Sequence, residues 1–491
     1  MTTTVPPATG EPGSAESGEA AGYRWRWAAL FVILGAEIMD LIDAMVTNIA
    51  APHIRAELGG SAGVIQWLGA AYMLAMATGL LTGGRLGDIY GRRRMFLVGA
   101  AGFTLGSLLC GLAQSPEILV GARVFQGLFA AVMIPQGLGM IREMFSPKEM
   151  ATAFGLFGPV MGLASVGGPI LAGWLIDADY FGSGWRMIFL INLPVGLLAF
   201  AAGLRFLPES RSPHPLRLDL LGVALASAAG LLVVFPLVQG REHDWPAWAF
   251  VMIAASAAVF GLFGWYQSRR AATGRDPLVV PSLFRKRAFN GGLVTGMVFF
   301  AGMSGFMLVF NLYTQIGLGY SPLKAGLAGV PWSVGMIFGF GLAQPLLKFG
   351  RRCFQAGTII MMAGAAGVWF TLHLEGLGVT PWQLTPALVV TGLGMGLLMA
   401  PFFDLVLAGV EDHESGSASG TLTAVQQLGN AFGVALLGTV FFDLLGVRPT
   451  GASFENAMET TLWVVVGMLA LTFVVSFLLP RRAREDQPSA H

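Results

Sequence analysis

Charged side chains are scarce in this chain of 491 residues. Asp, Glu, Lys and Arg together make up 12% of it, whereas hydrophobic residues make up 55%. A soluble domain carries about 25% charged residues, so the composition excludes an ordinary soluble protein. The mean hydropathy of +0.68 indicates an integral membrane protein. The length allows about twelve to fourteen spanning helices of roughly 20 to 25 residues each, with their loops.

Cysteine and histidine are also rare. Cys110 and Cys353 lie in or beside apolar segments without metal or redox spacing, so we expect buried, inert thiols. The six histidines show no metal-ligand spacing, and we predict neither a metal nor a cofactor. A net charge of +1 without a basic low-complexity block gives no reason to expect nucleic acid as a partner. Residues 1–22 lack the basic and apolar regions of a signal peptide and are predicted to be a disordered cytoplasmic tail.

The apolar segments predict the topology. We count fourteen of them, which places both termini on the same side. With a cytoplasmic N-terminus, 23 Lys and Arg residues lie on the cytoplasmic side and five on the other, while Arg123 lies within a span. The positive-inside rule therefore predicts that both termini are cytoplasmic.

The charged connection from Gln267 to Arg287 separates eight spans from six. We interpret this as a 6+2+6 arrangement of fourteen transmembrane helices in an all-α polytopic membrane protein. Transporters are often built from repeated halves with the substrate site between them. The predicted parts are a six-helix bundle at 23–210, inserted helices 7 and 8 with a basic linker at 211–287, a second six-helix bundle at 288–480, and a tail at 481–491.

Three carboxylates interrupt the first apolar segment, 27–51: Glu37, Asp40 and Asp43. At about 3.6 residues per turn, they share roughly a third of the helix circumference. Ionisable groups in a membrane helix mark ion or substrate handling, or pairing. We predict proton or cation coupling at this face. For Glu37, a protonated or hydrogen-bonded packing residue stays an alternative.

Arg123 and Asp404 are the other ionisable side chains singled out within spans. Arg123 is permanently charged and should face protein, water or a carboxylate; it either assists proton transfer or pins helices together. Asp404 lies towards the cytoplasmic end of its helix, where a substrate-side role and a simple helix cap are both open. For the substrate pocket, the ninth span offers the densest mixture of aromatic, thioether and polar groups. These are Met303, Met307, Phe310, Asn311, Tyr313 and Gln315.

Several motifs in order along the chain carry a resemblance to a known family. The loop from Gly84 to Arg94 resembles the signature loop of the major facilitator superfamily, and fourteen spans resemble its drug:proton antiporter branch. Further matches are Asp43 with Asn48, Ala50 and Pro52; Arg123 to Gly127; Gly168 to Gly173, with Ala172 where a glycine is usual; Trp185 to Pro194; and Gly416 to Gly420 with Gln426 to Gly429.

The resemblance implies a role for each motif. Gly84, Asp88, Gly91 and Arg92 would form a conformational latch, although arginines that only obey the positive-inside rule also fit. Gly168, Pro169 and Gly173 would shape the pocket and limit leak, although Gly and Pro are common in membrane helices anyway. Arg123 would act in proton transfer, with Gln126 as a polar neighbour that also belongs to the predicted substrate pocket.

These observations predict a monomeric transporter of the plasma (inner) membrane, surrounded by lipid. It would export small amphipathic organic compounds, such as drugs, antibiotics and dyes, in exchange for protons. Antiport is implied mainly by the resemblance, because buried acids alone suit symport equally well. A lipid or glycolipid flippase and proton-coupled uptake of a metabolite are the alternatives. A membrane enzyme would need a catalytic constellation, and the sequence offers no His/Asp cluster or Ser/His/Asp arrangement.

Overall fold

The computed structural model describes residues 23–146, 149–150, 152–153, 156–211, 217–411, 414–446 and 449–482. Within them, every long element is a helix and no strand is found. The predicted tail 1–22, and the tail 481–491 apart from Arg481 and Arg482, lie outside the described residues.

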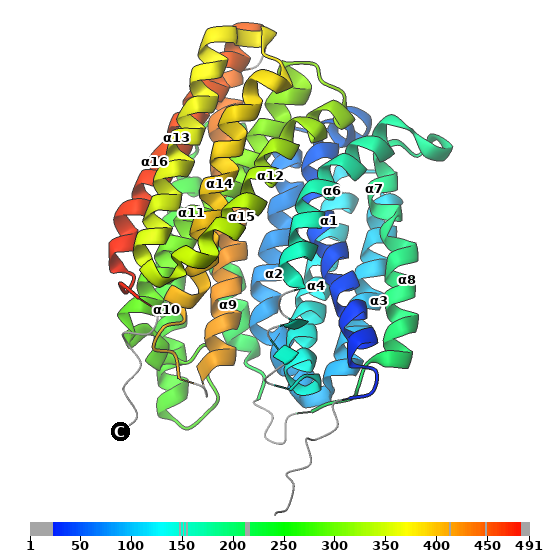
Figure 1. Cartoon of the computed structure of the whole chain (residues 1–491), viewed down its shortest axis with the longest axis vertical. Coiled ribbons are helices and arrows are strands. Elements are labelled where there is room, and N and C mark those ends of the chain that lie inside the picture. Colours follow the sequence, from blue (N-terminus) through cyan, green and yellow to red (C-terminus); the bar gives the residue numbers. More distant parts are fainter. Residues whose placement is uncertain are drawn as a thin grey trace, which may run out of the picture.

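Two groups of helices lie side by side, with a helical hairpin in sequence between them (Figure 1). The first group is α1 (Arg26–Leu58), α2 (Ala62–Tyr90), α3 (Arg92–Gly111), α4 (Pro116–Met144), α6 (Phe157–Asp177), α7 (Met187–Leu190) and α8 (Asn192–Phe206). The hairpin is α9 (Leu220–Gln239) and α10 (Ala247–Ala272). The second group is α11 (Arg287–Leu312), α12 (Pro322–Leu346), α13 (Arg351–Glu375), α14 (Pro381–Val406), α15 (Ser415–Leu445) and α16 (Gly451–Val475). We call the two groups the first and second bundle.

Local sequence sets where these helices begin. Ser115 and Ser321 accept hydrogen bonds from the backbone N–H groups at the starts of α4 and α12, and a proline follows each serine at the first helical position. Thr380 forms a capping box with Gln383 at the start of α14. A capping side chain satisfies a backbone donor that has no partner inside the helix.

Two loops, one in each bundle, have a glycine followed by arginines, Gly91 before Arg92 and Gly350 before Arg351. Gly91, between α2 and α3, has a φ of 99°, and Gly350, between α12 and α13, has a φ of 51°. Glycine adopts positive φ without the steric cost that a Cβ imposes. In both bundles a glycine with positive φ therefore directly precedes the arginine that starts the next helix.

Close helix packing inside each bundle depends on glycine. A Cβ on Gly83 would lie 2.0 Å from the carbonyl oxygen of Ala131, where α2 meets α4. A Cβ on Gly392 would lie 1.9 Å from that of Trp332, where α14 meets α12. Helices that associate in lipid rely on such close backbone approach.

Twelve helical segments among the described residues are long and apolar enough to cross a membrane. α1 and α6 are not among them. Glu37, Asp40 and Asp43 interrupt the apolar sequence of α1. α6 runs from Phe157 to Asp177, and its apolar stretch within the described side chains is Gly162–Asp177. The predicted count of fourteen is therefore not confirmed by this criterion.

Both ends of the described chain lie towards the bottom of Figure 1. Contacts between loops gather on this side: Arg26 bonds Glu149 at 2.8 Å, and the backbone N–H of Arg351 bonds the carbonyl oxygen of Arg481 at 3.1 Å. We call this side the terminal face and the other side the opposite face.

The bundles contact each other through α2 with α15, α6 with α12 and α1 with α11, and α9 packs against both α2 and α15. At the opposite face, Asp177 accepts hydrogen bonds from the Ser321 hydroxyl at 2.8 Å and from the backbone N–H of Leu323 at 3.1 Å. The bundles are therefore joined directly at this face.

Candidate functional site

An ion pair lies in the interior of the first bundle. Asp43 of α1 and Arg123 of α4 are in direct contact through Oδ2 and Nη1, and their side chains are 0% and 1% exposed. Removing two charges from water costs several kcal/mol per ion unless further hydrogen bonds compensate. The surroundings of the pair must therefore supply those bonds.

Neutral polar side chains from α4 itself and from two further helices, α3 and α8, surround the ion pair. Gln126 of α4 and Asn192 of α8 both donate to Oδ1 of Asp43, at 3.0 Å and 2.8 Å. Ser107 of α3 accepts from Gln126 at 2.8 Å. Arg123 also donates to the carbonyl oxygen of Leu68 in α2 at 3.2 Å. Every charge in this Asp43 cluster, which we define as Asp43, Ser107, Arg123, Gln126 and Asn192, is thus hydrogen-bonded.

Tyr72 of α2 joins Asp40 to this cluster. Its hydroxyl is hydrogen-bonded to Oδ1 of Asp40, and its ring lies under the Arg123 guanidinium, whose carbon is 4.2 Å from the ring centroid. A cation at this distance is attracted to the ring face. Asp43 thus contacts Arg123 directly, whereas Asp40 is connected to it through the hydroxyl and ring of Tyr72. Glu37 is half-buried one turn earlier.

Three of these side chains were not predicted as site residues: Tyr72, Ser107 and Asn192. Each is a neutral polar residue within an apolar segment, and the sequence offers many of those. Asn192 does fall inside the Trp185 to Pro194 motif, which was the one signal that could have identified it. The structure is needed because the donors and acceptors of this site come from five helices, α1, α2, α3, α4 and α8, that are far apart in the chain.

The predicted latch loop forms a chain of ion pairs at the terminal face. Arg92 bonds Asp88 at 3.1 Å and Glu143 of α4 at 2.6 Å. Gly84 lies close to Pro135, and Gly91 supplies the positive φ that lets α3 start directly after α2. The loop thus ties together three helices of the first bundle. A latch function remains a prediction, because these contacts do not reach the second bundle.

The predicted motif of α6 lies at the contact between the bundles. A Cβ on Gly173 would be 2.4 Å from the Cα of Leu323 in α12, and the carbonyl of Pro169 faces Gly326 of the same helix. Gly168 faces Met45 of α1. These residues permit close approach of α6 to both neighbours, and an effect on leak stays a prediction.

The residues predicted for the substrate pocket are dispersed. Gln126 belongs to the Asp43 cluster, Phe310 stacks on Phe306, and Asp404 is exposed. Gln315 donates to the carbonyl oxygen of Ile49 at 3.0 Å, which links α11 to α1. The remaining members, Met303, Met307, Asn311 and Tyr313, lie on α11 or in the π-helical turn Tyr313–Gly317 that follows it. This pocket stays a prediction.

A cavity of about 470 Å³ lies elsewhere, among α2, α9, α10, α11 and α15. None of the predicted pocket residues lines it. Sequence patterns could not locate this cavity, because its walls come from five helices and a connecting segment.

Two helical bundles joined by a hairpin, with an ion pair inside one of them, define a polytopic α-helical membrane protein of the kind built from repeated halves. The chain belongs to the Major Facilitator Superfamily, whose family profile matches residues 33–434.

The chain is similar to three curated antibiotic-related proteins. It is 44% identical to the probable actinorhodin transporter of Streptomyces coelicolor, covering 99% of this chain and 98% of the relative. It is 34% identical to puromycin resistance protein pur8 of Streptomyces alboniger, covering 92% and 91%. It is 32% identical to the tetracenomycin C resistance and export protein of Streptomyces glaucescens, covering 89% and 80%.

Solved structures share the fold. A POT family transporter in complex with 5-aminolevulinic acid is 16% identical with a TM-score of 0.67, over 94% of this chain and 97% of that one. A bacterial homolog of the human lysosomal transporter Spinster is 16% identical with a TM-score of 0.66, over 95% and 99%. At this identity the likeness concerns the fold alone.

Proposed function

We propose that this protein is a secondary active transporter that exports amphipathic organic compounds, antibiotics among them, from the cytoplasm in exchange for protons. The substrate class rests on the relatives, which are named for actinorhodin transport, puromycin resistance and tetracenomycin C export. The proton coupling rests on one arrangement: Asp43 pairs with Arg123, and Asp40 is hydrogen-bonded to Tyr72, whose ring lies against the same arginine.

The topology of the proposal has fourteen spans in a 6+2+6 arrangement. α1 and α6 are added to the twelve apolar spans because both pack lengthwise against spanning helices of the bundles. The terminal face is cytoplasmic, in the plasma membrane, and the transporter works as a monomer without a cofactor. The Lys and Arg distribution of the sequence supports this orientation.

Hydrogen-bond capacity assigns different roles to the two acids. Asp43 faces three donors, Arg123, Gln126 and Asn192. Because none of these groups accepts a bond from a protonated carboxyl as placed, Asp43 serves as the fixed counter-ion of Arg123. Asp40 faces the Tyr72 hydroxyl, which can donate or accept. The Asp40–Tyr72 pair therefore keeps a hydrogen bond whether or not the carboxyl carries a proton, and Asp40 is the proton carrier.

In the transport cycle that follows, substrate binds between the bundles from the cytoplasm and Asp40 releases its proton there. Rocking of the bundles exposes the site to the outside, where substrate leaves and Asp40 takes up a proton. When Asp40 is ionised, both it and Asp43 attract the positive charge of Arg123. The charge of Asp40 therefore affects interactions among α1, α2 and α4. Protonation of Asp40 thereby changes the preferred packing of these three helices of the first bundle.

Transport into inverted vesicles with an imposed pH gradient tests the proposal. The wild type should accumulate a fluorescent aromatic antibiotic only when the lumen is acidic. Asp40→Asn should bind the compound but ignore the gradient, and Asp43→Asn should lose transport. Asp443→Asn is the matched control, because Asp443 is an exposed acid near the end of α15. Wild-type accumulation that ignores the gradient would contradict antiport, and movement of labelled lipid alone would favour a flippase.

A further inference from the structure

The 470 Å³ cavity lies where the α9–α10 hairpin packs against the seam between the bundles. Its largest lining side chains are apolar: Leu81, Phe260, Phe263, Phe284, Leu293 and Leu428. Sites for drug-sized molecules have volumes of about 300 to 1,000 Å³ and are lined mostly by apolar and aromatic groups. The cavity therefore has the size and lining of a small-molecule site.

The lining offers no charged side chain. Its hydroxyls already donate within their own helices: Thr78 to the carbonyl of Leu74, Ser268 to that of Gly264 and Thr421 to that of Ser417. Because burying an unpaired charge is costly, an occupant of this cavity must be uncharged where it contacts the walls.

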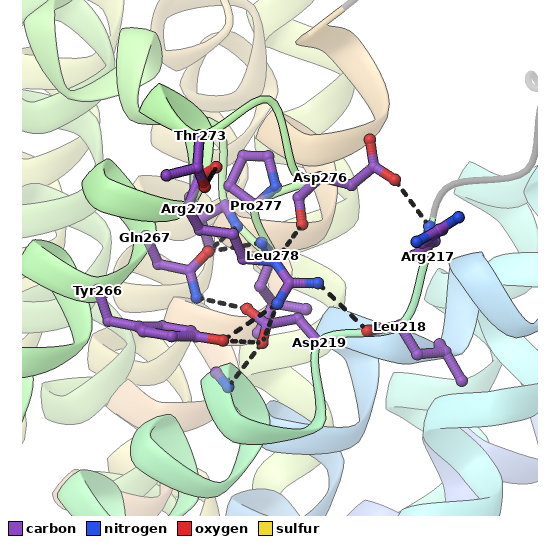
Figure 2. Close-up of polar contacts among 12 residues, drawn as sticks. Arg217, Leu218, Asp219, Tyr266, Gln267, Arg270, Thr273, Asp276, Pro277 and Leu278 are labelled. Carbon is purple, nitrogen blue, oxygen red and sulfur yellow. Dashed lines mark hydrogen bonds and ion pairs between the residues drawn. The ribbon is translucent and has the colours of Figure 1, made fainter.

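A polar network outside the cavity fixes its inner wall. Gln267 lines the cavity, donates to Oδ2 of Asp219 at 2.8 Å, and accepts from the backbone N–H of Leu278 at 2.5 Å. Figure 2 shows these bonds together with those of Tyr266 and Arg270, which also hold Asp219, itself 1% exposed. The segment that follows Leu278 supplies Val279, Pro281 and Phe284 to the lining, so the network positions that wall.

Residues 277–286, which include this wall segment, form hydrogen bonds and an ion pair with both bundles. Arg85 of α2 donates to the carbonyl oxygens of Pro277 and Leu278. On the other side, Lys286 pairs with Glu414, and the backbone N–H of Val280 donates to the Ser417 hydroxyl at 3.2 Å. The cavity is thus preformed by bonds to both bundles, which lowers the ordering cost of binding.

The outer wall of the cavity faces outward from the protein. Phe260 lines the cavity and is still 38% exposed, and Trp265 on the same helix is 56% exposed. Among the described residues of α10, only Ala249, Ser256 and Gln267 are buried. An apolar helix with this little burial borders lipid in a membrane protein, so an apolar compound can reach the cavity from the bilayer.

We propose that this cavity is a second binding site, for an uncharged apolar moiety of drug size, and that its occupant holds the two bundles in the arrangement seen here. Its walls come from α2 of the first bundle and from α11 and α15 of the second. Any relative movement of the bundles changes the cavity, so a ligand that fits it favours this arrangement by its difference in affinity. The moiety is either an aromatic compound or the acyl chain of a lipid.

Two glycines on α10 provide matched variants. Gly264 lines the cavity and Gly261, one turn earlier, does not, and a Cβ on either would meet no atom within 4 Å. Gly264→Leu fills part of the cavity, whereas Gly261→Leu adds the same side chain outside it. Ala226→Leu, from α9 on another wall, is a second filling variant in case Gly264→Leu folds poorly.

The experiment is photolabelling of the purified full-length protein in lipid nanodiscs, with labelled peptides identified by mass spectrometry. One arm uses an uncharged aromatic diazirine and the other a phospholipid with a diazirine at the end of its acyl chain. Label at Phe263, Phe284 or Leu428 is expected with one probe. In Gly264→Leu the new side chain displaces a leucine-sized part of the ligand, so the yield of label at these residues should fall about tenfold. In Gly261→Leu the yield of label should be unchanged.

The arm that labels the cavity identifies the source of the moiety. Label confined to outward residues of α10, such as Trp265, or equal cavity label in all variants, would overturn the proposal. A spin-label distance between the bundles that does not respond to the bound probe would overturn the coupling to bundle arrangement. These measurements need no transport, so their failure is distinct from a failure of proton antiport.

Discussion

The interiors of the two bundles differ in how they are held together. In the first bundle, Asp43 and Arg123 form an ion pair enclosed by amide and hydroxyl groups. In the second, aromatic rings occupy the interior: Phe402 lies 6.0 Å from both Phe300 and Phe354, and Phe306 stacks on Trp332 at 5.2 Å. Among the described residues, the charged side chains buried within the long helices are Asp40, Asp43, Arg85 and Arg123, and all four belong to the first bundle. Asp219 and Glu414 are buried as well, each directly before the start of a helix.

The two interiors should differ in how they respond to a change of charge. A buried ion pair depends on every donor around it, so a change of one charge alters several helices. Stacked rings are held by contact area and ring geometry, which pH does not alter. The proposed proton coupling therefore belongs to the first bundle, and the predictions below test that assignment.

The largest effect is expected from Asp43→Asn. It leaves Arg123 buried without its counter-ion, which should cost about 3–5 kcal/mol of stability and abolish transport. Thermal unfolding in detergent and the vesicle assay measure the two. Asp43→Asn with Arg123→Gln removes both charges and should recover much of the stability without transport. If the double variant still transports, the ion pair is only structural.

Phe402→Leu should have a smaller effect. It removes ring contacts with Phe300 and Phe354 but buries no charge, so we expect a loss of roughly 1–3 kcal/mol with an unchanged dependence of transport on the pH gradient. The same two assays apply. A loss of coupling in this variant would break the comparison, because it would place proton response in the second bundle.

Tyr72→Phe tests the link between the two acids. The ring under Arg123 is kept while the bond to Asp40 is lost, which should cost about 1 kcal/mol of stability. The pH profile of transport should change, whereas Phe402→Leu should leave that profile in place. An unaltered profile in Tyr72→Phe would remove Asp40 from the proposed proton path.

The smallest effect is expected at Glu414, an ion-pair residue outside the spans. Burial raises the pKa of Glu414, but hydrogen bonds from Lys286, Ser282 and the backbone of Glu411 outweigh it, so the pKa lies below its ordinary value. Its stabilisation is therefore present above the unfolded pKa of about 4.3 and lost as pH falls through the lowered value. Lys286→Gln should unfold at a lower temperature than wild type at pH 7. The difference between the two unfolding temperatures should become smaller towards pH 3. A difference in unfolding temperature that does not change with pH would contradict the stabilisation of ionised Glu414 by Lys286.

Much of the fold could be predicted from residue type and order. Apolar runs gave the helices, glycine followed by arginine gave the turns at Gly91 and Gly350, and the three acids in one apolar run identified α1 as unusual. Cys110 and Cys353 are buried, as predicted. The number of spans was harder, because α1 combines a membrane-spanning length with three charges.

The site was predictable only in its charged members. A carboxylate or a guanidinium in an apolar segment is conspicuous because burial without a partner is costly. Asn192, Ser107 and Tyr72 are neutral, and burying a neutral polar group costs much less than burying a charge. Their sequence context therefore did not distinguish them from packing residues. Asp219 was not singled out from the sequence either, yet it is 1% exposed in the network of Figure 2.

The membrane class, the helices and the ionisable groups that need partners follow from residue type and order, because they depend on the transfer cost of side chains and on local backbone preference. That Arg123 pairs with Asp43 while Tyr72 bonds Asp40 follows from the packing of the helices. The same packing places the cavity beside the α9–α10 hairpin. Partner choice and cavities depend on how helices far apart in the chain approach one another, and neither composition nor periodicity specifies that geometry.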